Sequence, residues 1–179
     1  MNEKIKAFEY IISLLVDWLM ELTDVDEETA LKEFNKLKLF KLHFFVSAIN
    51  TGPNHGNNDL LNTFNAFWAL PYGPVESDIY DNLPLLQIFS ISNQGISKKN
   101  NDTNQYFTSL DAFRNTIGNA VSALRRENNE IVTYSAFELV ELSHQWPVWS
   151  VLYDQALKQG RKSIPMPTPL IRASSKKFK

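Results

Sequence analysis

The Gly-Pro pair at residues 73–74, which follows an aromatic segment, constrains the fold more than any other feature of this sequence. Glycine allows the backbone angles of a sharp turn, and Pro74 has its φ angle preset for the first position of a helix. Glu76 then falls in the first helical turn, where a carboxylate meets the positive end of the helix dipole. Before the pair, alternating apolar side chains predict a half-buried strand: Phe64, Ala66, Trp68, Leu70 and Tyr72. We therefore expect a strand, a tight corner and a helix.

The helix expected after the corner carries Val75, Ile79 and Leu83 on one face and ends at Pro84. Aromatic side chains at such a corner commonly pack into a core. The alternative is a partner-binding surface, because interfaces draw their binding energy from a few aromatic anchors. In that case one or two members of a set of four are exposed: Trp68, Tyr72, Val75 and Tyr80. Both interpretations stay open from the sequence.

The composition indicates a chain that can bury a core and has no special attraction for charged partners. Its 179 residues suit one domain, and its 44% hydrophobic and 12% aromatic content argues against global disorder. A net charge of −2 gives no general attraction to nucleic acid or to an anionic membrane. The absence of cysteine excludes disulfides, thiolate metal sites and cysteine nucleophiles, and it is compatible with the cytoplasm. The longest uncharged run near the N-terminus, residues 10–16, is too short to span a membrane.

Apolar residues spaced three and four apart predict that most of the chain is helical. We expect helices near residues 3–22, 25–49, 105–126, 135–143 and 147–159. Ser135 and Glu138 have the spacing of a capping box, Pro147 suits the start of a helix, and Gly160 suits a helix C-terminus. The expected fold is mainly α, with five or six helices and a small antiparallel β element in a single compact domain at residues 1–160. A Pro-rich and then basic tail follows at residues 161–179.

The helix expected at residues 25–49 is the most apolar and should be the central buried helix. Its narrow polar side carries Lys32, Lys36 and His43. Lys38 and Lys41 lie among apolar neighbours, and we expect their amines to reach the surface along the aliphatic stems. The helix at residues 3–22 carries two apolar stripes, which indicates either a core helix or a homodimer interface.

Three further segments are less regular. Residues 86–91 and 96–98 can form a hairpin, and this hairpin can join the strand before Gly73 in one small sheet. Residues 50–59 form a loop, in which His55 and Asp59 lack the third ligand that a metal site needs. Three prolines prevent a continuous helix across residues 164–171. We expect this tail to lie extended on the body through Ile164, Met166 and Leu170, with a mobile basic end.

Three stretches of the sequence together resemble one family. The first is the aromatic segment that leads into Tyr72, Gly73, Pro74 and Val75, followed by Glu76 and Tyr80. The second contains Leu37, Lys38, Lys41, Leu42, Phe44 and Phe45, and the third contains Leu139, Leu142, Ser143, His144, Trp146, Pro147 and Trp149. Across roughly residues 36 to 150 they resemble the SocA-like (Panacea) antitoxin domain, which is related to phage-associated GepA-like proteins. The chain departs from that pattern at His43 and Phe44, where the family more often shows Leu and Tyr, and in the compact spacing from His144 to the tryptophans.

The resemblance implies a non-enzymatic antitoxin of the cytoplasm that binds and neutralises a toxin encoded nearby. Members of this family can also deliver the bound toxin to a protease, so a protease or chaperone is an additional expected partner. From the residues themselves we expect no cofactor, no metal and no membrane partner, and the net charge makes a nucleic-acid partner unlikely. The family resemblance adds nothing to these absences. It marks these motif positions in the chain: Leu37, Lys41, Leu42, Phe45, Gly73, Pro74, His144 and Trp149.

The residues also allow two other classes of function. A hydrolase or transferase would use His144 as a general base. However, successive side chains on a helix point about 100° apart, so Ser143 and His144 form no dyad by themselves. The sequence also lacks a nucleophile elbow, a phosphate loop and a dinucleotide fingerprint. A transcriptional regulator would need a basic recognition stripe, which the net charge disfavours. We therefore expect a protein-binding domain that is not an enzyme.

Overall fold

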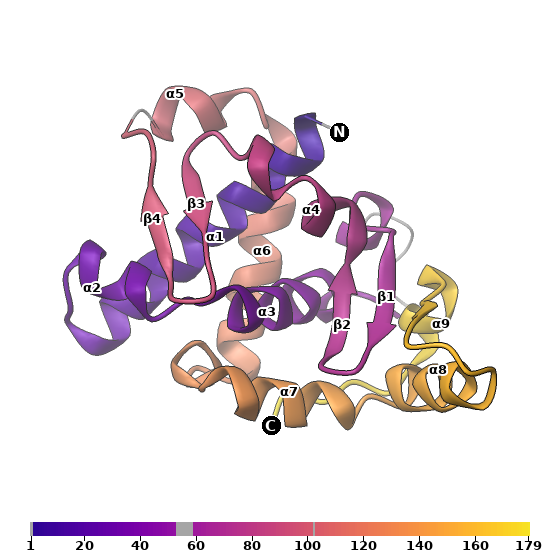
Figure 1. Ribbon diagram of the computed structural model, residues 1–179. Coiled ribbons are helices and arrows are strands. Elements are labelled where there is room, and N and C mark those ends of the chain that lie inside the picture. The colour runs from indigo at the N-terminus through magenta and orange to yellow at the C-terminus, as the bar shows by residue number, and fades with distance from the viewer. Residues whose placement is uncertain (1, 53–58, 102) are drawn as a thin grey trace.

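The computed structural model describes residues 2–52, 59–101 and 103–179, and it confirms a mainly α fold with a small antiparallel β element (Figure 1). His55 lies outside the described residues. The described chain contains five short strands: β1 (Phe67–Leu70), β2 (Gly73–Glu76), β3 (Phe89–Ile91), β4 (Ile96–Lys98) and β5 (Ile164–Pro165). It contains nine α-helices: α1 (Asn2–Thr23), α2 (Glu27–Lys32), α3 (Lys36–Ile49), α4 (Ser77–Asp81), α5 (Thr103–Thr108), α6 (Ala112–Glu127), α7 (Ala136–His144), α8 (Pro147–Lys158) and α9 (Thr168–Ala173).

Helix α3 is the central element, as its apolar sequence predicted. Every residue from 38 to 48 is buried. Helices α1, α6 and α7 and strand β2 all pack against it. In Figure 1 the β1–β2 hairpin and the β3–β4 hairpin lie on either side of α3, with α7 beneath it. The core is therefore built around one helix that has no polar face.

Two of the expected helices are each divided into a short and a long helix. The helix expected at residues 25–49 consists of two helices, α2 and α3. The side chain of Asn35 accepts a hydrogen bond from the N–H of Lys38 (2.9 Å) and so caps the N-terminus of α3. The helix expected at residues 105–126 is divided between α5 and α6, where Asp111 has a φ of 43°. These breaks, together with the short helices α4 and α9, account for the number of helices beyond the five or six expected.

The segment around the Gly-Pro pair is a β-hairpin, so the expectation of a helix beginning at Pro74 is wrong. Strand β1 pairs antiparallel with β2, and Leu70 lies opposite Gly73. The turn therefore consists of Pro71 and Tyr72, and Gly73 follows it with a φ of 91°. The pair at residues 73–74 does mark a sharp change of direction, but the chain continues from it as a strand.

Helix α4 begins after Glu76, which lies at the end of β2. The Glu76 carboxylate accepts one hydrogen bond from the N–H of Ile79 (2.8 Å) and one from the N–H of Ala66 (3.0 Å). It also forms an ion pair with Lys4 of α1 (2.5 Å). One buried carboxylate thus caps α4, binds the start of β1 and ties the hairpin to α1.

The alternation in β1 is out of phase with the expected pattern by one residue. Phe67 and Ala69 face the core, whereas Trp68 and Leu70 are half-buried on the outer face. Phe64 is buried as well, but it precedes the strand. Because side chains alternate strictly along a strand, a shift of one residue exchanges the inner and outer faces.

The three-stranded sheet has the order β2-β1-β5, and its third strand comes from the tail. The β3–β4 hairpin is present as expected, but it forms a separate sheet, so the expectation of one joint sheet is wrong. In its place, β5 pairs with β1, and the N–H of Met166 donates to the carbonyl of Phe67 (2.8 Å). Met166 is buried and Ile164 is half-buried, but Leu170 is exposed on α9.

The basic end of the chain packs on the body, so the expectation that it is mobile and solvated is wrong. Arg172 forms two hydrogen bonds of 2.8 Å with the carboxylate of Asp59. The indole N–H of Trp146 donates to the carbonyl of Lys177 (2.7 Å), and Phe178 is buried. The tail therefore holds Asp59, which caps the short 3-10 helix at Leu60–Asn62 ahead of β1, and it holds the start of α8 through Trp146.

Gly73 and Gly160 both have positive φ angles, 91° and 68°, but their surroundings differ. A Cβ atom on Gly73 would overlap the Oγ atom of Ser143 and lie 3.0 Å from the Nζ atom of Lys41, whereas one on Gly160 would meet no heavy atom within 4 Å. We predict that Gly160→Ala lowers the free energy of unfolding by about 1 kcal/mol through backbone strain. Gly73→Ala should lower it by about 1–3 kcal/mol more, because the strain is joined by overpacking. Urea unfolding of both variants measures the difference, and equal losses would contradict this account of Gly73.

Candidate protein-binding site at the hairpin tip

Lys41, in the middle of α3, is fully buried, so the expectation that its amine reaches the surface is wrong. Its Nζ atom donates a hydrogen bond to the carbonyl oxygen of Pro74 in β2 (2.5 Å). Burial lowers the pKa of Lys41 well below its ordinary value, because a low-dielectric surrounding disfavours the ammonium form. A neutral amine still donates to a carbonyl, so this contact does not depend on the charge.

The contact from Lys41 closes the free edge of β2. The N–H of Ser77 donates to the carbonyl of Ala66 (2.9 Å), so these two residues form a hydrogen-bonded pair. Every second pair along the register is then hydrogen-bonded too, which includes Leu70 and Gly73 at the turn. Because bonded and non-bonded pairs alternate in an antiparallel ladder, the carbonyl of Pro74 points away from β1. Pro74 has no N–H, and Lys41 binds its carbonyl. The edge of β2 therefore offers no partner to an incoming strand at this position.

The tip of the hairpin, residues 70–72, lies on the junction of α7 and α8. The indole N–H of Trp149 donates to the carbonyl of Leu70 (3.0 Å). The Trp149 ring lies between His144, whose ring centroid is 3.8 Å away, and Tyr153, whose centroid is 5.1 Å away, and both are stacked on it. His144 thus packs against a tryptophan of the next helix. This ring stack and its hydrogen bond fix the position of the tip.

Ser143 and His144 face different surroundings, although they are adjacent in the sequence. Ser143 is buried, and its hydroxyl donates to a carbonyl of its own helix (2.8 Å). His144 is directed to Trp149. Burial lowers the pKa of His144, while Glu141 and a hydrogen bond with the backbone of Pro71 partly oppose that shift. The geometry therefore gives His144 a packing role and does not join it to Ser143 as a nucleophile–base pair.

His43 is fully buried, so its expected place on a polar side of the helix is wrong. Three aromatic rings surround it, with centroid distances of 4.8 Å to Phe8, 4.3 Å to Phe64 and 5.7 Å to Phe67. Burial, with a smaller contribution from Lys4, lowers the pKa of His43 to about 3. The ring is therefore neutral near pH 7 and packs as a core aromatic side chain.

The four side chains considered for partner binding do not form one cluster. Trp68 and Val75 are cross-strand neighbours, half-buried on the outer face of the hairpin. Tyr72 is 61% exposed at the tip, and Tyr80 is 44% exposed on α4, where its ring packs on Phe40. Since a four-residue strand spans about 13 Å, the two tyrosines lie at opposite ends of β2.

The remaining motif positions of the central helix contribute to the core. Leu42 and Phe45 are fully buried, and Leu37 is half-buried. The Phe45 ring lies 6.2 Å from the ring of Trp146 and 6.0 Å from the ring of Phe178. These residues support the site from beneath and do not reach its surface.

Tyr153 and Leu157 belong to the surface of the site but were not singled out as binding residues. They follow Trp149 at intervals of four residues, which places all three on one face of α8. The hairpin tip covers Trp149, leaves Tyr153 half-buried and leaves Leu157 exposed. The spacing marks this face in the sequence, but only the structure shows where the tip stops covering it.

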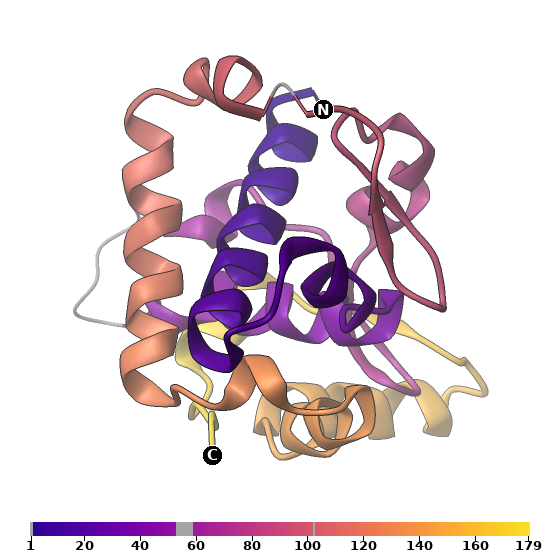
Figure 2. The same cartoon turned by 90° about the vertical axis from the view of Figure 1, so that its left-hand side faces the viewer.

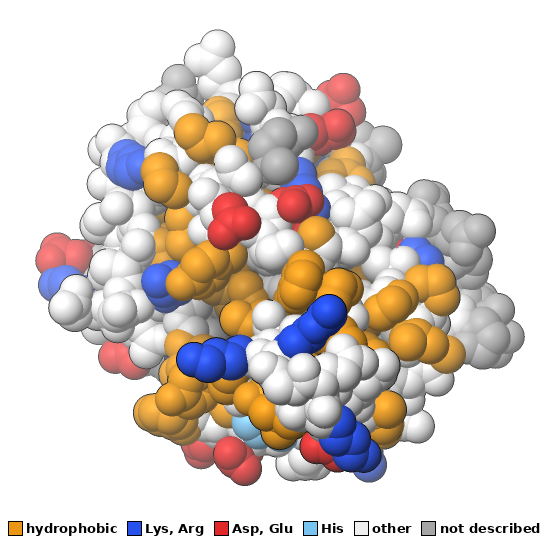
Figure 3. Space-filling view, turned by 45° about the vertical axis from the view of Figure 1, so that its right-hand side comes forward, with side chains coloured by type: hydrophobic (Ala, Val, Ile, Leu, Met, Phe, Trp, Pro, Cys, Tyr) orange, Lys and Arg blue, Asp and Glu red, His pale blue; other side chains and the backbone are white. Residues whose placement is uncertain are grey.

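Hydrophobic side chains gather on the face that carries the β1–β2 hairpin and α8, with lysine and arginine side chains among them (Figure 3). Lys36 lies beside Tyr80, with its Nζ atom 5.0 Å from the ring centroid. Lys158, the last residue of α8, is exposed, and so are Arg161 and Lys162 just beyond it. The surface around the tip is therefore apolar with basic neighbours. We call this surface, made of Tyr72, Tyr153, Leu157 and the outer face of the hairpin, the tip surface.

Comparisons with known proteins found nothing similar: the chain matches no family model, no curated protein and no solved structure. Within residues 2–52, 59–101 and 103–179, no three histidine or acidic side chains are placed to hold a metal ion. No helix of that part of the chain is long and apolar enough to cross a bilayer.

Lys41 should make stability depend on pH. Because its pKa in the folded state is lowered, the unfolded state binds more protons between that pKa and the ordinary value of 10.5, so stability rises with pH across this window. We predict that Lys41→Met removes a slope of up to about 1.4 kcal/mol per pH unit between about pH 7 and about pH 9. Urea unfolding across this range measures the slope, with Lys36→Met as the control on the same helix. The same slope in wild type and Lys41→Met would contradict the prediction.

Proposed function

We propose that this protein is a non-enzymatic antitoxin of the cytoplasm, which binds a toxin encoded beside it through the tip surface. The observation that carries the proposal is the exposure of Tyr72, an aromatic residue that is 61% exposed while Trp149, which binds the tip, is buried. Tyrosine is enriched among the anchors of protein interfaces, where a large ring with a polar end is held in a fixed position.

The three stretches that carry the family resemblance meet at the β1–β2 hairpin, beneath the tip surface, although they are far apart in the sequence. Lys41 of the first helical stretch binds the carbonyl of Pro74. Gly73 lies against Ser143 of the third stretch, and Trp149 of that stretch binds the carbonyl of Leu70. Their convergence on one surface element supports a shared role, namely to hold the hairpin in a binding position.

The rigidity of the support favours binding. A side chain that is already held in its bound position loses little conformational freedom when a partner arrives. The tip is held by one hydrogen bond from Trp149 and by the ring stack of His144, Trp149 and Tyr153. Such a tip can present Tyr72 without a large ordering cost.

The charges around the tip surface indicate the chemistry of the partner. Lys158 follows Leu157 directly in the sequence, and Arg161 and Lys162 come shortly after it, so a partner with apolar pockets and acidic neighbours is electrically complementary. The same binding would serve direct neutralisation or the delivery of the toxin to a protease. A hydrolase or transferase with His144 as general base is less well supported, because the His144 ring is stacked on Trp149.

Co-expression tests the proposed function directly. The product of each small reading frame adjacent to the gene is expressed alone and together with this protein, and growth is measured. We expect one product to arrest growth alone and to form a complex with this protein that restores growth. The absence of any such product would overturn the antitoxin proposal, whatever the tip surface binds.

The role of the tip surface is tested by truncating its anchor. We predict that Tyr72→Ala weakens binding of the toxin by about 1–2 kcal/mol and leaves the thermal midpoint nearly unchanged, because the ring is exposed. Phe137→Ala is the matched control, since Phe137 is also an exposed aromatic residue (68%) but lies at the opposite end of α7 from His144. Calorimetric titration measures both affinities. Equal affinities of the two variants would remove the tip from the interface.

A further inference from the structure

A second candidate site lies away from the tip surface, in a groove whose floor is α1. Figure 2 shows α1 running between α6 on one side and the β3–β4 hairpin on the other. The groove holds a cavity of about 220 Å³. That volume is below the roughly 300–1,000 Å³ of sites for drug-sized ligands. The groove therefore suits a ligand smaller than a nucleotide.

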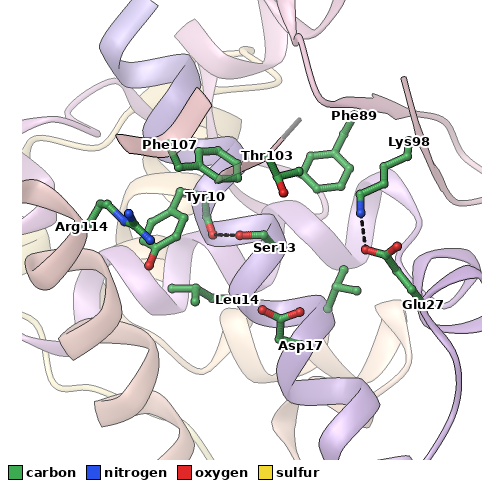
Figure 4. Close-up of a pocket in the computed structure, with 11 residues that line it drawn as sticks. Tyr10, Ser13, Leu14, Asp17, Glu27, Phe89, Lys98, Thr103, Phe107 and Arg114 are labelled. Atoms are coloured by element: carbon green, nitrogen blue, oxygen red, sulfur yellow. Dashed lines mark hydrogen bonds and ion pairs between the residues drawn. The ribbon is translucent and has the colours of Figure 1, made fainter. Parts of the chain in front are cut away.

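The floor of the groove is an outward-facing row of α1. Tyr10, Leu14 and Asp17 follow one another at intervals of four and three residues, which puts them on one helix face. Phe107 of α5 packs on Tyr10, with ring centroids 5.2 Å apart. The middle of the groove is thus apolar and aromatic, and an acidic side chain stands at one end of its floor (Figure 4).

Two opposite charges face the groove from its two ends. Arg114 of α6 places its guanidinium over the ring of Tyr10, 5.1 Å from the ring centroid. Asp17 lies two helical turns farther along α1, near Glu27 and Lys98, which are paired with each other at 2.5 Å. Within the described ranges, neither Arg114 nor Asp17 has an ion-pair partner, and they are not paired with each other. In Figure 4 the side chains of Tyr10 and Leu14 lie between Arg114 and Asp17, and all four line the groove.

The end of the groove at Asp17 has an excess of negative charge. Burial raises the pKa of Asp17, and the nearby carboxylates of Glu27 and Glu21 raise it further, whereas Lys98 opposes them. Lys98 pairs with Glu27, and Arg125 pairs with Glu21. Neither of these cations is paired with Asp17. A cationic group on a ligand would remove this repulsion by pairing with Asp17.

We propose that this groove binds a short linear zwitterion, an unblocked peptide of about three residues, with its ammonium group on Asp17 and its carboxylate on Arg114. Seven residues of α-helix rise about 10 Å, which is the approximate separation of the two charged ends of the groove. An extended chain of three residues spans about 10 Å. A single amino acid is too short to reach both charges, and the aromatic middle of the groove would contact the peptide between its ends. This proposal does not rest on the proposed antitoxin function.

The peptide termini provide a test that needs no protein variant. Wild-type protein is titrated with Ala-Ala-Ala, with its N-acetyl form, with its C-terminal amide and with alanine, by calorimetry and by amide shifts in NMR spectra. We expect Ala-Ala-Ala to bind at least tenfold more tightly than each of the other three, and the shifts to fall on residues 10–17 and 107–114. Absence of binding at about 10 mM Ala-Ala-Ala, a concentration tenfold above the Kd of about 1 mM of a weak complex, would overturn the proposal. Equal binding of the blocked peptides would overturn it as well.

Two variants assign each charge to one end of the peptide. In Asp17→Asn, Ala-Ala-Ala and its N-acetyl form should bind equally, while the amide keeps its disadvantage. In Arg114→Gln, Ala-Ala-Ala and its amide should bind equally, while the N-acetyl form keeps its disadvantage. Asp154→Asn and Arg161→Gln, which remove exposed charges on or beside α8, are the matched controls and should bind as wild type does. If these controls reproduce the effects at the groove, the binding is a general charge effect and the proposed site is wrong.

Discussion

The hydrogen bond from Lys41 to the carbonyl of Pro74 joins the central helix to the hairpin, and the geometry of the tip surface depends on it. Lys41 belongs to the central buried helix, and the packing around its side chain holds the amine in one position. The carbonyl that it binds lies directly after Gly73, whose positive φ lets the chain leave the turn as a strand. Strand β2 therefore has hydrogen-bond partners along both edges: β1 on one edge, and the Lys41 amine at the carbonyl of Pro74 on the other. The turn that follows from this arrangement leaves Pro71 and Tyr72 exposed, and the ring of Tyr72 is 61% exposed.

The C-terminal segment also holds the hairpin and α8 in place, through contacts away from the turn. Strand β5 pairs with β1, and Arg172 binds the carboxylate of Asp59, which caps the 3-10 helix at Leu60–Asn62. The carbonyl of Lys177 receives the indole N–H of Trp146 at the start of α8. The helix that carries Trp149 is therefore tied to the tail, and the tail is tied to β1. Both sides of the contact between Trp149 and the tip are therefore held by the C-terminal segment, β1 by Ile164 and Pro165 and α8 by Lys177.

The sequence predicted the elements well where a local pattern decides them and failed where a distant partner decides them. The helical stripes of α1 and α6, the capping box at Ser135 and the β3–β4 hairpin were all local signals. The helix expected from Pro74 was wrong because the pairing of β2 with β1 overrode a proline signal that fits a helix start equally well. Lys41 was expected at the surface because its carbonyl partner lies 33 residues away.

The identity of residue 41 can be argued from what the position requires. A methionine or leucine would fill the space but leave the carbonyl of Pro74 buried without a donor, which costs about 1–3 kcal/mol. An arginine could donate but would keep its charge, because its pKa is too high to be shifted far enough by burial. A serine or asparagine would be too short to cross from the helix axis to the strand. Lysine alone combines the reach with a donor that remains after the proton is lost. A buried lysine between apolar neighbours is therefore the chemical solution to closing a strand edge from inside the core.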